Sequence, residues 1–423
     1  MSAQKPSANT LKGLNTSKGA GKLVELPKIV RTAAVRLEMT AEASAKLLAT
    51  QKLYGDACQI LMDILLAGSR EERRWQRFTL HHAGYQIVRE KLPDLGSQCV
   101  CNAIRTVSSA AKSWISNHPK FAMDKSMAIP ALSFKNPVVH LDKNTITYGK
   151  VGSEITATIY SIEGRVQATL RPGPFQAEIL ASGKWAESNL VHRKGVRGKT
   201  DYWELHIAVE KEAALPALEN LLLEQVMGVD AGENNIAAIS CGRIWNAGKL
   251  KHDRDRYLAN RSRLQRNGSR SAKQHLRKAS RRERRHTKHV NNVVSKEIVA
   301  EAQHRGIRLL VLEDLTHIRE RIKAGKRVRT RLHRWPFREL QQQIVQKAAR
   351  TGIRTMFVDP RYTSQTCNRC KALAKRRKHL LVCQCGNRAH ADVNASRNLR
   401  DLGCLLAPKG RRKLAPDVEP LQG

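Results

Sequence analysis

Val226-Met-Gly-Val-Asp230-Ala-Gly-Glu-Asn-Asn235-Ile-Ala-Ala-Ile-Ser240 is the stretch that decides the fold of the C-terminal half of this chain. It contains two short apolar runs, and a Gly-Glu-Asn-Asn turn separates them. Two such runs joined by such a turn predict a β-hairpin. We therefore expect strands over 225–230 and 235–240, and a third strand over 242–245.

Downstream of this hairpin, the sequence changes to alternating strand and helix patterns. The apolar run 307–312 predicts a strand that ends just before Glu313. Apolar residues at every fourth position predict a helix from Pro336 to Thr351, and Gly352 marks its C-cap. A further strand is expected over 353–358. This order of three strands, helix, strand, helix and strand is that of an RNase H-like sheet, in which three antiparallel strands precede crossover units.

Three acidic residues stand at the edges of these segments. Asp230 and Glu313 follow apolar strands, and Asp392 opens an expected helix. Hydrolysis of a phosphodiester by two Mg²⁺ ions requires carboxylates from several elements to converge on cations about 3.5–4 Å apart. We therefore predict that these three residues are catalytic Mg²⁺ ligands. Asp314 is expected to point elsewhere because side chains alternate along a strand, and Glu233 is interpreted as a hairpin residue.

The composition favours a polyanionic partner. Lys and Arg total 76 against 37 Asp and Glu, which gives a formal net charge of +39. Repulsion on this scale destabilises a compact fold unless a polyanion neutralises it, so RNA or DNA is the expected partner. Aromatic residues make up only 4% of the chain, which argues against a surface built mainly on base stacking.

The most basic stretch is 251–290, with fifteen Lys or Arg and three Asp or Glu. Asn267-Gly268-Ser269 interrupts it, and an apolar stripe at Val290, Val294 and Ile298 follows. We predict a helical hairpin over 251–304 that packs on the nuclease domain and projects arginines outwards. The predicted nucleic-acid-binding residues are Arg261, Arg263, Arg266, Arg270, Arg277, Arg281, Arg282, Arg285 and Arg397. Arg397 and Asn398, one turn beyond Asp392, either face the scissile phosphate or have a packing or capping role.

Four of the nine cysteines cluster near the C-terminus, as Cys367, Cys370, Cys383 and Cys385. An odd total with a local cluster suits a reduced compartment and a metal site better than a disulfide framework. Two paired knuckles predict a closed tetrahedral Zn²⁺ site. The second pair has a gap of only one residue, which is tight for a knuckle, so His379 or His390 is kept as an alternative to one of the cysteines.

The N-terminal half has a different pattern. Residues 1–32 are rich in Ser, Ala, Gly and Lys and are interpreted as a disordered basic tail. A short strand is expected over 33–39, and helices over 40–66, 80–92 and 97–114. Alternating runs at 144–148, 154–160, 165–170 and 202–209 then predict a small antiparallel barrel or sandwich. No apolar run reaches the length of a membrane span and no signal peptide is visible, so we expect a cytoplasmic protein.

These motifs resemble those of the TnpB family of transposon-associated RNA-guided nucleases and of the compact type V CRISPR effectors. The matching segments are Gly228-Val-Asp230-Ala-Gly232, Leu312-Glu-Asp-Leu315, Trp335-Pro-Phe with the helix after it, Asp359-Pro-Arg-Tyr-Thr-Ser-Gln-Thr-Cys367 and Ala391-Asp-Val-Asn-Ala-Ser-Arg-Asn-Leu399. The resemblance covers the C-terminal half closely. In the N-terminal half, only the layout of a strand, a helical insert and β structure agrees.

The resemblance implies a multidomain α+β protein with a RuvC-like nuclease domain over 225–362 and 391–410. Its triad would be Asp230, Glu313 and Asp392, with two Mg²⁺ ions. It also implies a zinc-bearing target-nucleic-acid segment with one Zn²⁺. The remaining expected parts are a wedge-like β domain (33–39 and 118–212), a helical recognition lobe (40–117), a linker (213–224), the zinc-bearing segment (363–390) and a C-terminal tail (411–423).

The function that the resemblance implies is RNA-guided, Mg²⁺-dependent cleavage of double-stranded DNA at a single RuvC-like site. The partners would be a guide RNA, which supplies sequence specificity, and target DNA, with the protein acting as a monomer or as a homodimer on one guide. The main alternative is a guide-RNA-dependent DNA-binding repressor with little or no cleavage. An unguided Holliday-junction-type nuclease and a passive nucleic-acid-coating protein are two further alternatives. The intact acids disfavour the repressor and the coating protein, and the large basic N-terminal half disfavours the junction nuclease.

Overall fold

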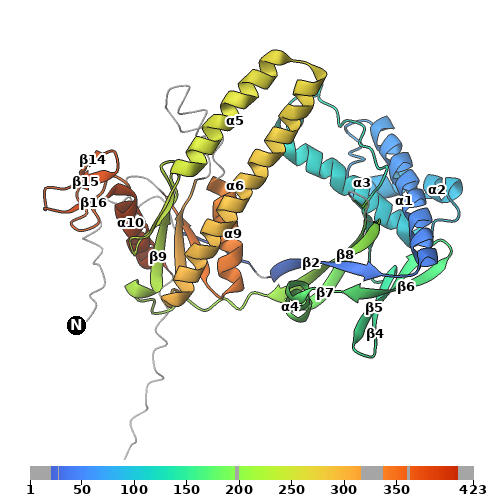
Figure 1. Cartoon of the computed structure of the whole chain (residues 1–423), viewed down its shortest axis with the longest axis horizontal. Coiled ribbons are helices and arrows are strands. Elements are labelled where there is room, and N and C mark those ends of the chain that lie inside the picture. Colours follow the sequence, from blue (N-terminus) through green and yellow to red (C-terminus); the bar gives the residue numbers. More distant parts are fainter. Residues whose placement is uncertain (1–20, 27, 196–199, 316–336, 360–362, 408–423) are drawn as a thin grey trace, which may run out of the picture. The chain divides into compact units, whose positions relative to one another are not determined.

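The computed structural model describes residues 21–26, 28–195, 200–315, 337–359 and 363–407 of the chain. It divides into two compact units (Figure 1). The N-terminal unit is Val30–Lys211, and the C-terminal unit combines Met1–Ile29 with Glu212–Gly423. All the acidic and cysteine motifs singled out above belong to the C-terminal unit.

The N-terminal unit contains one seven-stranded sheet, in the order β3-β7-β8-β2-β6-β5-β4. Its strands are β2 (Lys28–Glu38), β3 (Val139–Leu141), β4 (Ile146–Val151), β5 (Glu154–Ser161), β6 (Gly164–Arg171), β7 (Lys184–Arg193) and β8 (Tyr202–Glu212). The predicted small antiparallel barrel or sandwich is observed as a curled half-barrel, with β3 and β4 at its two edges. The predicted strands β4, β5, β6 and β8 are confirmed, whereas β3 and β7 were not predicted. In β7, a bulge between Trp185 and Ser188 breaks the alternation that sequence analysis relies on.

Four helices accompany this sheet: α1 (Ala41–Ala67), α2 (Arg77–Lys91), α3 (Ser97–Asn117) and α4 (Pro174–Ala181). The first three were predicted, and the Thr40 hydroxyl caps α1 by accepting from the Ala43 N–H at 3.1 Å. Sequence analysis placed the helical insert and the β structure in separate domains. In the structure, Leu47 and Leu61 of α1 belong to the same buried core as Ile159 and Leu205 of the sheet. The helices and sheet therefore fold as one unit.

The C-terminal unit is built on a six-stranded sheet, in the order β1-β13-β12-β9-β10-β11. Its strands are β1 (Lys22–Leu23), β9 (Val226–Asp230), β10 (Asn235–Ile239), β11 (Ile244–Asn246), β12 (Leu309–Glu313) and β13 (Arg354–Val358). Strands β9, β10 and β11 pair antiparallel, and β12 and β13 run parallel to β9. The predicted order of three antiparallel strands followed by two further strands is confirmed.

Strand β1 is a correction to the predicted disordered tail. Lys22 and Leu23 pair antiparallel with Phe357 and Met356 of β13, and residues 28–32 belong to β2. The tail was assigned from its polar composition, but a two-residue strand needs only a free sheet edge to pair with. Residues 1–20 and the predicted tail 411–423 lie outside the described residues.

Two layers of helix cover the sheet of the C-terminal unit. Leu310 and Leu312 of β12 pack in one core with residues of α6 (Arg270–His304) and α9 (Phe337–Arg350). Leu309 and Val311 point to the opposite face, where they join Leu399 and Leu402 of α10 (Ala391–Leu406). Burial on both faces explains why these strands are continuous apolar runs.

Close contact between α10 and β9 requires a glycine. A Cβ atom at Gly228 would lie 1.8 Å from the backbone oxygen of Ser396, which no side chain tolerates. This approach brings the N-terminal turn of α10 to the end of β9 where Asp230 lies.

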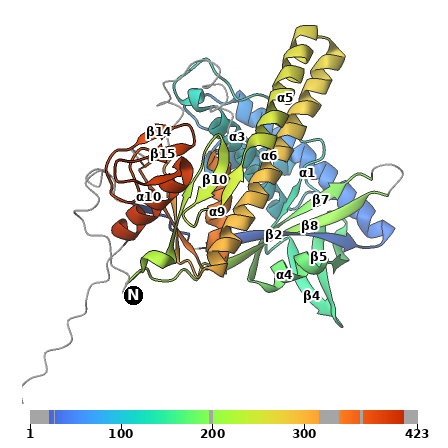
Figure 2. The ribbon, with the colours of Figure 1, turned by 60° about the vertical axis from the view of Figure 1, so that its left-hand side comes forward.

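The basic hairpin predicted over 251–304 is confirmed as α5 (Gly248–Asn267) and α6, which stand side by side and project from the sheet (Figure 2). Gly268 adopts a left-handed φ of 64° between them, and the Ser269 hydroxyl caps α6. Val294 and Ile298 anchor the base of α6 in the core.

The predicted linker is also packed against this unit. It includes the short 3₁₀ helix η3 (Leu223–Gln225), and its Leu218 and Leu221 are buried in the core beneath α10. No helix within the described residues is long and apolar enough to cross a lipid bilayer.

Candidate active site and cysteine cluster

The three predicted catalytic acids come from three different elements. Asp230 ends β9, Glu313 ends β12, and Asp392 lies in the first turn of α10. Strands β9 and β12 are parallel neighbours in which Leu312 pairs with Val229, so Glu313 and Asp230 follow at the same edge of the sheet. Asp230 and Glu313 lie close enough for each carboxyl group to shift the pKa of the other, and the charge of Asp392 acts on both. The structure therefore brings the three acids together.

Burial and neighbouring charges shift the pKa values of two of these acids. Burial, followed by the charges of Glu313 and Asp392, raises the pKa of Asp230 well above its ordinary value. Burial also raises the pKa of Glu313 to about 7, although hydrogen bonds from Thr363 and Asp230 oppose the shift. Without a cation, Asp230 and Glu313 compete for protons because like charges are held close together away from water. A divalent cation would relieve that repulsion.

Neighbouring side chains fix the orientation of two of the acids. The Thr363 hydroxyl donates to Glu313 Oε1 at 3.1 Å. Asn235 Nδ2 donates to Asp392 Oδ2 at 2.8 Å, and Arg376 Nη2 donates to Asp392 Oδ1 at 3.1 Å. Sequence analysis assigned no role to Asn235, Thr363 or Arg376. Asn235 lies in the predicted hairpin, Thr363 in the motif before Cys367 and Arg376 among the basic residues between Cys370 and Cys383, and only these places gave a signal.

The two other nearby acids have different surroundings. Asp314 uses its backbone N–H to bond the Val358 carbonyl at 2.7 Å, and Glu233 forms an ion pair with Lys251 at 3.7 Å. The ion pair of Glu233 agrees with its interpretation as a hairpin residue, and the direction of the Asp314 side chain stays a prediction.

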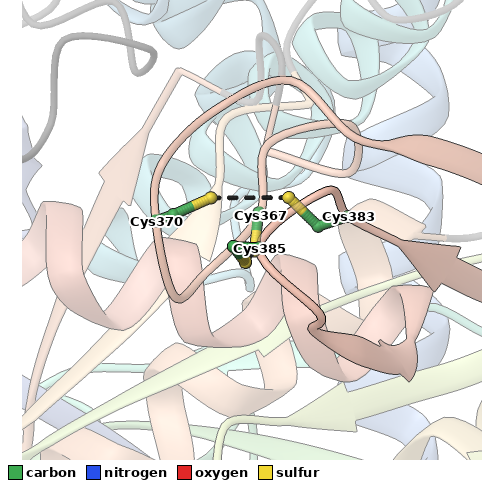
Figure 3. Close-up of side chains that lie close together, drawn as sticks. All are labelled: Cys367, Cys370, Cys383 and Cys385. Carbon is green, nitrogen blue, oxygen red and sulfur yellow. Dashed lines mark hydrogen bonds between the residues drawn. The ribbon is translucent and has the colours of Figure 1, made fainter.

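The four clustered cysteines converge on one point (Figure 3). Their sulfur atoms all lie within 4.8 Å of one another; the pair Cys367 and Cys385 is 3.7 Å apart and the pair Cys370 and Cys383 is 3.4 Å apart. The one-residue gap before Cys385 does not prevent convergence, because Gly386 adopts a φ of 82° and bonds back to the Cys383 carbonyl. Four thiolates at this spacing could bind a metal ion and fit Zn²⁺.

The alternative histidine ligands are not part of this group. His379 and His390 stack on each other with ring centroids 5.9 Å apart, and His390 Nδ1 accepts from the Asp392 N–H. The donors around Cys367 favour its thiolate form. Desolvation opposes ionisation of Cys367, yet N–H groups of Cys370, Asn387 and Arg369 hold its pKa at about 6.

The predicted nucleic-acid-binding arginines fall into two groups. Those of the hairpin lie on α5 and α6, where Arg261 is half-buried and the others are exposed: Arg263, Arg266, Arg270, Arg277, Arg281, Arg282 and Arg285. Arg397 is different, because it is half-buried on α10 and its Nε donates to the Ser240 carbonyl at 3.3 Å.

Comparisons with known proteins agree with this architecture. Residues 337–399 match the family model described as Cas12f1-like, TNB domain. A TnpB-like protein of Methanocaldococcus jannaschii is 32% identical over 205 residues, which cover 44% of this chain and 73% of that protein. The chain belongs to the family of TnpB-like proteins. The family match spans α9, the cysteine cluster and the N-terminal part of α10, where Asp392 lies.

Other relatives of this TnpB-like chain extend the comparison. The CRISPR-associated endodeoxyribonuclease Cas12f1 of Sulfoacidibacillus thermotolerans is 37% identical over 113 residues, or 26% of this chain. Those residues span only 25% of the length of that relative. A solved structure of a Cas12f1–sgRNA–target DNA complex superposes with a TM-score of 0.59 and covers 89% of this chain and 99% of that one. At 14% identity, this likeness shows a shared mixed α/β fold.

Proposed function

We propose that this protein is an RNA-guided, Mg²⁺-dependent DNA endonuclease with a single RuvC-like active site formed by Asp230, Glu313 and Asp392. The observation that carries the proposal is the position of these acids together at one end of the sheet, where the pKa values of Asp230 and Glu313 are raised. The TnpB-like family of the chain and the Cas12f1 endodeoxyribonuclease among its relatives support it.

The residues of the site suit Mg²⁺. Carboxylates from three elements supply hard oxygen ligands, and the raised pKa values of Asp230 and Glu313 indicate a site in need of positive charge. When bound, a pair of divalent cations would activate the attacking water and stabilise the leaving oxygen of the phosphodiester.

The surrounding side chains would preorganise this site. Thr363 fixes the rotamer of Glu313, and Asn235 occupies one oxygen of Asp392. Arg376 is about one-third exposed, with a side-chain exposure of 34% while it pairs with Asp392. Its guanidinium is therefore able to contact a phosphate at the same time as the acid, and we propose that it stabilises the charge on the cleaved phosphate.

The positive surfaces suit the expected partners. Exposed arginines along α5 and α6 would hold the backbone of a guide RNA and its paired DNA strand, since such contacts need charge and not base identity. The cysteine cluster would hold one Zn²⁺ and shape the target-nucleic-acid segment beside the acids. The N-terminal unit would grip guide and target through the sheet and helices assigned above to a wedge and a recognition lobe.

Guided plasmid cleavage tests this function. The protein would be purified with its RNA, that RNA sequenced, and a plasmid carrying the matching target incubated with Mg²⁺. We expect Asp230→Ala to abolish cleavage while RNA binding stays within about twofold of wild type, because Asp230 faces a cation and not a base. An Asp230→Ala protein that cuts at the wild-type rate would refute the assignment.

A further inference from the structure

Helix α10 carries a polar face that the proposed catalysis does not use directly. Asn394, Asn398 and Asp401 recur at helical spacing on it, and their exposed fractions are 0%, 0% and 6%. Side chains this polar are buried only where they have partners. Their partners lie in the segment 363–371, which leads into the cysteine cluster.

Asn398 holds three groups of that segment. Its Nδ2 lies 2.9 Å from the Thr363 carbonyl and 2.7 Å from the Thr366 carbonyl, and its Oδ1 accepts from Lys371 Nζ at 3.2 Å. One turn earlier, Asn394 donates to the Thr366 carbonyl at 2.7 Å and accepts from the Asn368 N–H at 2.8 Å. The alternative that Asn398 faces the scissile phosphate is wrong, since every polar atom of its side chain is engaged within the fold.

Lys371 forms a further contact between this segment and α10. It follows Cys370 directly, has a left-handed φ of 62°, and lies buried with an exposed fraction of 6%. Its ammonium group forms an ion pair with Asp401 at 2.5 Å. We call Lys371, Asn394, Asn398 and Asp401 the α10 clamp. A buried ion pair of this kind is weak evidence for stability but strongly fixes geometry, because neither charge tolerates separation.

The clamp lies between the cysteine cluster and the acids. Thr363, held through its carbonyl by Asn398, orients Glu313 through its hydroxyl. Arg376, on strand β14 (Lys375–Arg377) between the two cysteine pairs, donates to Asp392. Both contacts to the acids therefore come from a segment whose shape depends on the four sulfurs and whose position depends on the clamp.

We propose that the α10 clamp couples the two metal sites, so that a thiophilic cation on the cysteine cluster strengthens divalent-cation binding by Asp230, Glu313 and Asp392. This inference rests on the proposed function in assigning a cation to the acids. Asn398 and Lys371 act as positioning residues. Without a cation at the sulfurs, the segment that carries the four cysteines becomes less ordered. Thr363 and Arg376 then no longer keep their hydrogen bonds to Glu313 and Asp392, and the acids are no longer held in one arrangement. Because coupling between binding sites is reciprocal, a cation at the acids must also slow loss of the cation from the sulfurs.

The test measures Mn²⁺ affinity and zinc release on the full chain. Mn²⁺ binding would be followed by electron paramagnetic resonance in wild type, Cys385→Ser, Asn398→Ala and the double variant. Cys385→Ser and Asn398→Ala should each weaken the Asp230-dependent Mn²⁺ site by about 10–100-fold, as loss of support around a metal site typically does. The double variant should be little weaker than either single variant, because both changes break the same connection.

Asn291→Ala is the matched control. Asn291 is another buried asparagine of the C-terminal unit, on α6, where it bonds Glu339 at 3.5 Å and touches neither metal site. We expect it to leave the Mn²⁺ affinity within about twofold of wild type while costing folding stability of the same order as Asn398→Ala. Unchanged Mn²⁺ affinity in Cys385→Ser, or fully additive losses in the double variant, would overturn the coupling.

Zinc release separates failure of the coupling from failure of the proposed function. A chromogenic chelator should extract zinc from Asn398→Ala at least about tenfold faster than from wild type or Asn291→Ala, whether or not the acids bind a cation. Equal release rates would overturn the clamp. Mn²⁺ binding that is insensitive to Asp230→Ala would instead overturn the proposed active site, and clamp-dependent zinc release would then stand alone. A Lys371→Met, Asp401→Leu double variant that releases zinc at the wild-type rate would also contradict a need for the charged pair.

Discussion

Replacing Glu313 with glutamine should stabilise the cation-free protein while it destroys the cation site. Burial raises the pKa of Glu313 from its ordinary value of 4.5 to about 7 in the folded state. At 1.36 kcal/mol per unit, the buried carboxylate costs about 3 kcal/mol of folding free energy at pH 8. Glutamine has the same shape and still accepts from Thr363, but has no charge to bury. We expect the free energy of unfolding of Glu313→Gln to exceed that of wild type by about 1–3 kcal/mol, because burying the amide also has a desolvation cost.

The stability difference between Glu313→Gln and wild type depends on pH. A carboxyl group whose folded pKa is raised leaves stability intact below its unfolded pKa and removes it as pH rises through the folded pKa. The advantage of Glu313→Gln should therefore be absent near pH 4, grow between pH 4.5 and 7, and level off above. Urea denaturation of the full chain at several pH values, in buffer free of Mg²⁺, measures it.

Magnesium should stabilise wild type relative to Glu313→Gln. Wild type gains about 2.7 kcal/mol when Mg²⁺ is present at 100 times its dissociation constant, and Glu313→Gln should gain little. The control is Glu301→Gln, because the pKa of Glu301 is lowered by its hydrogen bond to Arg305, so that this change should cost stability. A Glu313→Gln protein that is no more stable than wild type at pH 8, with wild-type stabilisation by Mg²⁺, would refute the reasoning.

Three more outcomes follow from the structure. Cys385→Ser should lower bound zinc from about one ion per chain towards none, measured by mass spectrometry of metals, and full retention would contradict a four-sulfur site. Replacing the exposed Arg281, Arg282 and Arg285 with serine should reduce the slope of log K against log salt for RNA binding by about 2–3, whereas replacing Arg305, paired with Glu301 at 2.6 Å, should change it by less than about 1. Gly228→Ala should destabilise the C-terminal unit by more than about 2 kcal/mol, because its methyl group would meet the Ser396 carbonyl of α10 at 1.8 Å. A normal urea midpoint in that variant would contradict the close packing.

Sequence patterns predicted the strands best where both faces of the sheet are buried. The strands around Asp230 and Glu313 are buried on both faces, so their apolar runs are unambiguous and the order of the C-terminal sheet followed. The convergence of the three acids followed from that order as well. The helical hairpin was predicted because its polar sequence is interrupted at Gly268 and ends in an apolar stripe.

The parts that sequence reasoning missed depend on tertiary pairing. Strand β1 has only two residues and exists because β13 offers an open edge. The bulge in β7 hides its alternation. Asn235, Thr363 and Arg376 are common polar residues whose role depends on which carboxylate they meet. Asn398 was ambiguous because a helical position beyond Asp392 predicts a face of α10 but not the segment that covers it.

The central claim is that Asp230, Glu313 and Asp392 hold a pair of divalent cations. Crystals of the protein with its guide RNA, soaked in Mn²⁺, test it most directly through anomalous scattering. We predict two peaks about 3.5–4 Å apart, each bonded to at least one of the three carboxylates, and their loss in Asp230→Ala. Anomalous density that is absent from this site in wild type, while Mn²⁺-dependent cleavage persists, would contradict the account.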